Sequence, residues 1–196
     1  MKYSFKNDYS EGCHPRILEA LAQNNLDQQN GYGLDQYSEN AARLIKEKAH
    51  APQSQVHFVS GGTQANLIVI SSILRPHESV VAASTGHIFT NESGAIEATG
   101  HKVHGVETQY GKLRPEDIQK VLDVHTNVPH QVKQKLVYIS NSTEIGTIYT
   151  KKELQILSGF CKEKGLYLFM DGARLGHALT ADSNDLTLED VAKLTD

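Results

Sequence analysis

Apolar residues are spaced along this chain in two alternating patterns. Short runs rich in valine, leucine and isoleucine are typical of buried strands, and the stretches between them repeat apolar residues every three or four positions, as amphipathic helices do. The pattern predicts strands at 56–60, 79–84, 101–106, 135–140 and 166–171, and helices at 37–50, 63–74, 92–99, 115–124 and 151–164, with one more after Thr187.

Two of these helices carry recognisable ends. Pro115 stands near the first position of one helix, and Thr150 and Gly165 bracket the next as its N-cap and C-terminal cap. The first 35 residues are rich in turn formers such as Gly31 and Gly33, and they are predicted to form a long connecting loop. Strands that alternate with helices predict an α/β fold with a mostly parallel sheet and flanking helices.

The alternation begins only after the first quarter of the chain. We therefore expect an N-terminal arm and helix at residues 1–50 and an α/β domain at 51–196. The last three residues, LTD, read as a helix end with another strand about to begin. From this pattern we expect 51–196 to be an incomplete domain of a larger protein.

Composition narrows the class of protein. A net charge of −4 and a pI near 6.2 favour neither nucleic acid nor an anionic membrane as a partner. The longest apolar stretch, 67–74, is far shorter than the roughly 20 residues that span a bilayer, and the N-terminus lacks the apolar core of a signal peptide. The two cysteines offer no disulfide framework, which fits a cytoplasmic protein.

Candidate chemistry lies where predicted strands end, because parallel sheets bind ligands there. Gly61, Gly62 and Thr63 join a strand to a helix, an arrangement that lets backbone N–H groups hold a phosphate. A tight turn without a ligand explains the glycines equally well. The absence of a following Gly-Lys-Ser/Thr argues against a nucleotide-binding P-loop.

His87 and Asp171 end two other predicted strands. His87 could stack on a planar ring or move a proton, or it could be an ordinary loop histidine. Asp171 needs a partner because a buried unpaired charge is costly, and either Arg174 or a cationic ligand atom could serve. A turn that can bind phosphate, a side chain that can stack on a ring and an anion that can pair with a ring nitrogen together match pyridoxal 5′-phosphate.

Two further groups of polar residues are less specific. Asn141, Thr143 and Glu144 follow another predicted strand, where they could contact a ligand or form a turn. His101 and His104 would point to opposite faces of a strand, so the sequence predicts no metal site there.

The motifs NGYGLDQY, SGGTQAN, TGHIFTNESGAIEATGHKV and MDGARLGHAL resemble those of low-specificity L-threonine aldolases in the β-eliminating lyase group. The resemblance extends over nearly the whole chain. It implies the large domain of the fold-type-I, aspartate aminotransferase-like fold, pyridoxal phosphate as cofactor, and a homodimer or homotetramer. The implied reaction is the cleavage of L-threonine or L-allo-threonine to glycine and acetaldehyde.

The resemblance also implies a role for individual residues. Gly61, Gly62 and Thr63 would hold the phosphate, His87 would stack on the ring and handle a proton, and Asp171 would pair with the ring nitrogen. Arg174 would contact the ring oxygen or the substrate carboxylate. Asn7 and Ser10 would lie near the substrate, and Tyr32 would help to build the site of its own or of a neighbouring subunit.

The chain departs from the family in two respects. The C-terminal small domain that the resemblance implies is absent from these 196 residues. Such enzymes attach the cofactor to a lysine in a Gly-Thr-Lys-like setting, and these 196 residues contain no such motif. Lys193 is the nearest candidate, but its place in an amphipathic helix favours a solvated side chain. The alternative function is therefore an inactive module that binds a phosphate ligand or mediates oligomerisation.

Overall fold

The computed structural model describes Ser4 and residues 6–196, which form two compact units. The first unit, Met1–Ala41, contains helix α1 (Pro15–Asn24). Helix α2 (Gln36–Lys48) begins in the first unit and ends in the second, Ala42–Asp196. All strands of the described chain belong to the second unit, which also contains the predicted strand ends.

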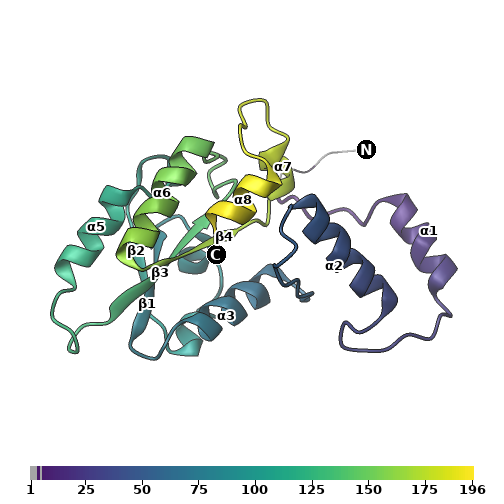
Figure 1. The fold of residues 1–196 in the computed structure, drawn as a ribbon, viewed down its shortest axis with the longest axis horizontal. Helices are drawn as coiled ribbons and strands as arrows, with labels where there is room; N and C mark the ends of the chain where they lie inside the picture. Colours follow the sequence, from purple (N-terminus) through teal and green to yellow (C-terminus); the bar gives the residue numbers. More distant parts are fainter. Residues whose placement is uncertain (1–3, 5) are drawn as a thin grey trace. The chain divides into compact units, whose positions relative to one another are not determined.

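The second unit is built on a four-stranded sheet in which every neighbouring pair is parallel (Figure 1). In space the strands follow the order β2-β1-β3-β4. Their bounds are Glu78–Ala83 for β1, Val103–Val106 for β2, Lys133–Ser140 for β3 and Tyr167–Asp171 for β4. Because the strands are parallel, their carboxyl ends meet at one edge of the sheet.

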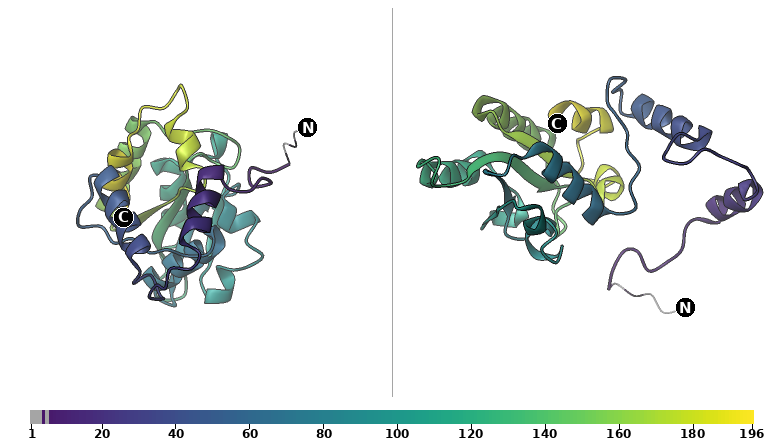
Figure 2. Two further views of the ribbon diagram at one scale, coloured as in Figure 1. Left: turned by 90° about the vertical axis from the view of Figure 1, so that its right-hand side faces the viewer. Right: turned by 90° about the horizontal axis from the view of Figure 1, so that it is seen from below.

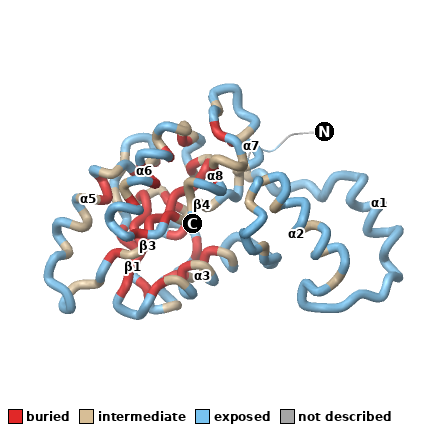
Figure 3. Tube along the Cα trace, in the orientation of Figure 1, coloured by how far each residue is buried: buried red, intermediate tan, exposed pale blue. Residues whose placement is uncertain are grey.

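Both faces of the sheet are covered by helices. Alternate residues of β1 and β3 enter two separate apolar cores, with Val81 and Val137 in one and Val80 and Leu136 in the other. Helices α5 and α6 contribute to the first core, and α3 and α4 to the second (Figures 1 and 2). The two central strands, β1 and β3, are accordingly the most buried strands of the sheet (Figure 3).

Helices α4, α5 and α6 of the second unit connect consecutive strands, whereas α3 precedes β1 and α7 and α8 follow β4. These helices are α3 (Gly62–Ile73), α4 (His87–Thr90), α5 (Pro115–Val124), α6 (Lys151–Lys164), α7 (Leu175–Leu179) and α8 (Leu188–Leu194), with 3₁₀ turns at Glu97–Thr99 and Gln109–Gly111. Helices α5 and α6 have the predicted bounds. Thr150 accepts a hydrogen bond from the backbone N of Glu153, and Gly165 ends α6 with a φ of 65°. No helix of the described residues is long and apolar enough to cross a membrane.

The strand predicted at 56–60 is not present. These residues have no regular secondary structure, and Phe58 and Val59 are exposed. The alternating pattern gives a segment the capacity to form a strand, but a strand forms only where a neighbour completes its hydrogen-bond ladder. None of the four described strands pairs with this segment.

Two other local predictions were wrong. The helix predicted at 92–99 shrinks to the 3₁₀ turn Glu97–Thr99, because Ser93 and Gly94 adopt positive φ angles of 53° and 77° that end a helical path. The loop predicted for the first 35 residues contains α1, which begins at Pro15. The signal for α1 was present in the sequence, because Pro15 stands at the start of the helix and Ile17, Leu18 and Leu21 follow at helical spacing.

Candidate active site

A cavity of about 200 Å³ opens at the carboxyl ends of β3 and β4. Its lining comes from the start of α3, the start of α4, the end of β3 and the turn after β4: Gly62, Thr63, Asn66, His87, Ser140, Ser142, Glu144, Asp171, Ala173 and Arg174. Five of the six residues predicted to hold the cofactor line it together. The sixth, Gly61, is the N-cap of α3 and directly precedes Gly62.

The start of α3 provides an open anion site. The first N–H groups of a helix lack acceptors within the helix, and the helix dipole adds partial positive charge there. A Cβ atom built on Gly61 or Gly62 meets no atom within 4 Å, so the backbone is bare on the side where a side chain would stand. Ser60 donates through both its backbone N and its Oγ to Gln64 Oε1, which fixes the turn before the helix.

Asp171 ends β4 with a carboxylate that accepts three hydrogen bonds. Its Oδ2 accepts hydrogen bonds from Tyr138 OH at 2.7 Å and Asn66 Nδ2 at 3.0 Å, and its Oδ1 accepts one from the backbone N of Ala173 at 2.9 Å. Burial, and then the charge of Asp171, raise the pKa of Tyr138 far above its usual value. Tyr138 therefore remains a hydrogen-bond donor at any physiological pH.

His87 begins α4 directly after the N-cap Gly86. Its ring Nδ1 lies 2.8 Å from Glu92 Oε1, and its backbone N donates to Glu144 Oε1 at 2.9 Å. A Cβ atom on Gly86 would lie 2.9 Å from the carbonyl oxygen of Ala83, so the chain turns too tightly at the end of β1 for any residue larger than glycine. This turn brings the imidazole to the cavity.

The chain matches a known family. The family model described as beta-eliminating lyase matches residues 8–196. A low specificity L-threonine aldolase of Pseudomonas aeruginosa is 33% identical over 89% of this chain and 50% of its own length. A threonine aldolase structure from Leishmania major is 56% identical, with a TM-score of 0.97, over all of this chain and 57% of its own.

The chain belongs to the beta-eliminating lyase family. An archaeal alanine:glyoxylate aminotransferase, 19% identical with a TM-score of 0.69 over 90% of this chain and 44% of its own, shares the fold alone. The fold-type-I prediction is therefore confirmed. This beta-eliminating lyase chain spans about half the length of the curated relatives it matches.

Pyridoxal 5′-phosphate is the cofactor of this family, and the residues present fit it. The bare backbone at Gly61 and Gly62 leaves room for a phosphate at the positive end of α3. Asp171 supplies a carboxylate, and His87 a flat aromatic ring, in the same cavity. These features are independent of one another in the sequence, which strengthens the match.

The other sequence candidates have other positions. Asn141 and Thr143 are buried in local structure: Asn141 Oδ1 accepts from the backbone N of Tyr149, and Thr143 Oγ1 lies 2.7 Å from Thr147 Oγ1. Glu144 lines the cavity. Asn7, Ser10 and Tyr32 belong to the first unit, where Ser10 Oγ donates to Asn7 Oδ1 at 2.6 Å. Their predicted role near a substrate stays a prediction.

Three residues that sequence analysis missed complete the site: Asn66, Glu92 and Tyr138. Asn66 lies one helical turn after Thr63, so its spacing was a usable signal. Glu92 follows His87 by five residues across a turn, and Tyr138 lies inside a buried strand. The sequence pattern therefore gives no sign that either residue belongs to the site.

Lys193 has none of the properties of a lysine that attacks a carbonyl. It lies on α8 and forms an ion pair with Glu189. This partner raises the pKa of the Lys193 ammonium above its usual value. A protonated amine is not a nucleophile, so the structure agrees with the solvated role expected from the sequence.

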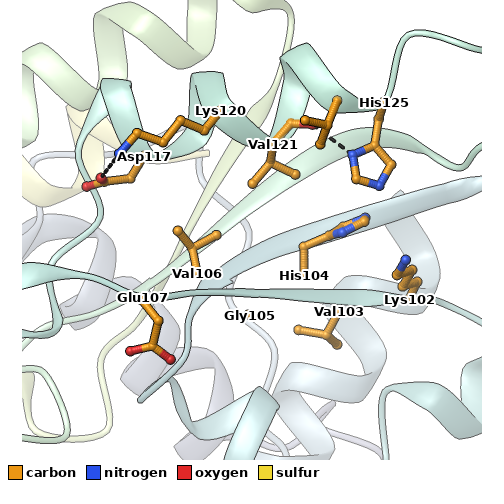
Figure 4. A pocket seen from close by; sticks show the side chains of 11 residues that line it. Lys102, Val103, His104, Gly105, Val106, Glu107, Asp117, Lys120, Val121 and His125 are labelled. Carbon is orange, nitrogen blue, oxygen red and sulfur yellow. Dashed lines mark hydrogen bonds and ion pairs between the residues drawn. The ribbon is translucent and has the colours of Figure 1, made fainter.

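His101 and His104 lie away from this cavity and bind no common atom. His101 Nδ1 lies 3.2 Å from the backbone O of Glu78, and His104 Nε2 lies 3.1 Å from Ser79 Oγ. Figure 4 shows His104 beside His125 in a second hollow, between β2 and α5. Among the residues that the structure describes, no group of three metal-binding side chains occurs.

Proposed function

We propose that a protein carrying this chain is a pyridoxal-phosphate-dependent aldolase that cleaves L-threonine or L-allo-threonine to glycine and acetaldehyde. The observation that carries the proposal is the single cavity that gathers Gly62, Thr63, His87, Asp171 and Arg174. The names of the relatives, threonine aldolases of Pseudomonas and Leishmania, support the substrate class.

In this proposal the phosphate binds the backbone N–H groups at the start of α3, from Gly61 to Thr63. Arg174 binds the ring oxygen or the substrate carboxylate through its guanidinium. Asn7, Ser10 and Tyr32 contribute to the substrate side of the site. These residues orient the substrate so that its Cα–Cβ bond can break without a search through other conformations.

The bound cofactor supplies a sink for the electron pair that remains on Cα when the Cα–Cβ bond breaks. Asp171 keeps a proton on the pyridine nitrogen, because its carboxylate places a negative charge next to that atom. His87 would lie against the ring and accept the β-hydroxyl proton at Nε2 as the Cα–Cβ bond breaks and acetaldehyde leaves. A proton from the imidazolium or from solvent would then go to Cα and give glycine.

His87→Ala in the complete enzyme tests this function. We expect wild-type protein to release acetaldehyde from L-threonine, and His87→Ala to turn over about 10²–10⁴-fold more slowly, the usual contribution of a general acid–base group. The His87 side chain is partly exposed, but its Nδ1 is a hydrogen-bond partner of the buried Glu92, so the melting temperature should fall and turnover is measured per folded site. Acetaldehyde can be measured by coupling to its enzymatic reduction.

Two results would contradict the proposal. Wild-type protein that binds pyridoxal phosphate but forms no acetaldehyde from either substrate would favour the alternative, a module that binds the phosphate ligand without turnover. Full activity of His87→Ala would leave the fold and cofactor assignments standing and remove the role of the imidazole.

We also propose that the protein is a cytoplasmic homodimer or homotetramer. Cys13 and Cys161 are both free thiols, as is usual in a reducing compartment. The first unit leaves Leu26 and Tyr32 almost wholly exposed, and exposed apolar side chains of this size favour association. Sedimentation equilibrium of the complete protein should give two or four times the monomer mass, and a monomer at micromolar concentration would refute the assembly.

A further inference from the structure

Glu92 lies behind His87 and is almost completely buried. Its side chain is 1% exposed, against 39% for the His87 side chain. Its Oε1 lies 2.8 Å from His87 Nδ1 and accepts a hydrogen bond from Asn66 Nδ2 at 2.6 Å, while its Oε2 is buried without a hydrogen-bond partner. A carboxylate in this position is costly for stability, so it calls for a functional explanation.

Asn66 links this carboxylate to the one predicted to serve the cofactor. Its single Nδ2 donates to Glu92 Oε1 and to Asp171 Oδ2. The two hydrogens of the amide nitrogen are thereby both used. An amide nitrogen is only a donor and does not titrate, so Asn66 holds the two acids in place and conducts no proton between them.

The hydrogen bonds at Glu92 determine which nitrogen of His87 carries the proton. An ionised carboxylate can only accept hydrogen bonds, so with Glu92 ionised the Oε1 atom accepts from Asn66 and Nδ1 of the neighbouring imidazole is the donor. In a neutral imidazole a proton on Nδ1 leaves a free electron pair on Nε2. Charged acceptors form hydrogen bonds roughly twice as strong as neutral ones, so a buried carboxylate enforces this choice.

The geometry points to Glu92 as a positioning residue that fixes His87 in the Nδ1–H form, with Asn66 anchoring Glu92 to Asp171. The use of this form in catalysis rests on the proposed function: only an imidazole with a free Nε2 can accept a proton from the substrate. The arrangement itself is a property of the chain and exists without a cofactor.

Nitrogen NMR of the complete protein, labelled with ¹⁵N-histidine and kept free of cofactor, tests the assignment. At about pH 9, where imidazoles are neutral, the two ring nitrogens have distinct shifts that identify the protonated one. These 196 residues contain ten histidines, and the signals lost in His87→Gln identify those of His87. We expect wild-type His87 to be the Nδ1–H form.

Glu92→Leu removes the acceptor and should convert His87 to a mixture that contains the Nε2–H form. Glu144→Leu is the matched control, since Glu144 contacts the backbone N of the same histidine and not its ring; here the Nδ1–H form should persist. Should Glu92→Leu not fold, Glu92→Gln retains a neutral, weaker acceptor, and the Nδ1–H fraction should still fall.

An Nε2–H form in the wild-type protein, or an unchanged Nδ1–H form in folded Glu92→Leu and Glu92→Gln, would overturn the inference. The experiment separates this inference from the proposed function. If the complete protein forms no acetaldehyde but the tautomer shifts as expected, the function is wrong and the positioning role stands. If acetaldehyde forms and the tautomer does not shift, the reverse is true.

Discussion

Asp171→Asn in the complete enzyme is expected to lower kcat by about 100-fold or more, the scale seen when a group that stabilises developing charge is removed. The amide cannot keep the pyridine nitrogen protonated, so the electron sink weakens when charge develops on Cα. Ground-state contacts to threonine change less, so KM should move less than kcat. Both values are measured per folded active site, from steady-state rates and a cofactor titration.

The hydrogen bonds of Asp171 predict a cost in stability as well. Donors face both of its oxygens: Ala173 N on one side, and Tyr138 OH and Asn66 Nδ2 on the other. The NH₂ group of an asparagine would therefore face a donor in either orientation. We expect Asp171→Asn to lose about 1–3 kcal/mol of unfolding free energy, the usual penalty for a buried hydrogen-bonding group without its partner.

Tyr138→Phe is the matched control for this loss. It removes one donor from the same carboxylate but keeps the negative charge, so stability should fall by a similar amount and kcat per folded site by less than about tenfold. An Asp171→Asn enzyme that melts early but turns over normally would show that the carboxylate serves only the fold. That outcome would refute its pairing with the pyridine nitrogen.

Asp171 also illustrates what the sequence could predict. A buried apolar run that stops on a carboxylate marks the end of a strand, and parallel strands bring such ends to one edge of a sheet. Helices α5 and α6 were predictable for a related reason, because Pro115, Thr150 and Gly165 are local signals that need no tertiary partner. The residues that form the cavity were therefore largely accessible to sequence analysis.

The residues that hold the cavity residues in place could not be predicted from the sequence. Asn66 contacts residues 26 and 105 positions away in the chain, and no local pattern encodes a contact at such a distance. The segment 56–60 failed for the complementary reason: its alternation is a strand signal, but strand formation depends on a neighbouring strand that none of the described residues provides. Local capping and periodicity were reliable, whereas long-range pairing was not.

Acidification is expected to destabilise the second unit through His104. Burial, followed by the nearby His125 and Lys102, lowers the pKa of His104 from its usual 6.5 to about 4. Its Nε2 lies within hydrogen-bond distance of Ser79 Oγ and Gln134 Nε2, and Gln134 Nε2 can only donate, so the folded state requires the neutral ring. Asp117 and Lys120 of α5, and Glu107 after β2, line the same hollow (Figure 4).

The sign of the effect follows from the two protonation states. The unfolded chain takes up the proton near pH 6.5 and the folded chain only near pH 4, so protonation favours unfolding throughout that interval. The stability is fully present above pH 6.5 and is lost as the pH falls toward 4. The interval corresponds to about 3 kcal/mol, and water at the open side of the hollow reduces this to about 2 kcal/mol.

Urea unfolding of wild type and His104→Gln at pH 7 and pH 4.5 measures this contribution. The loss of unfolding free energy between the two pH values is compared between the two proteins, so that the effects of carboxylates common to both cancel. Glutamine does not titrate, so His104→Gln should lose about 2 kcal/mol less stability than wild type between the two pH values. His125→Gln is the matched control: it removes a smaller cause of the lowered pKa and leaves the burial of His104, so it should retain most of the wild-type acid sensitivity. Equal losses in wild type and His104→Gln would show that His104 is not the titrating group.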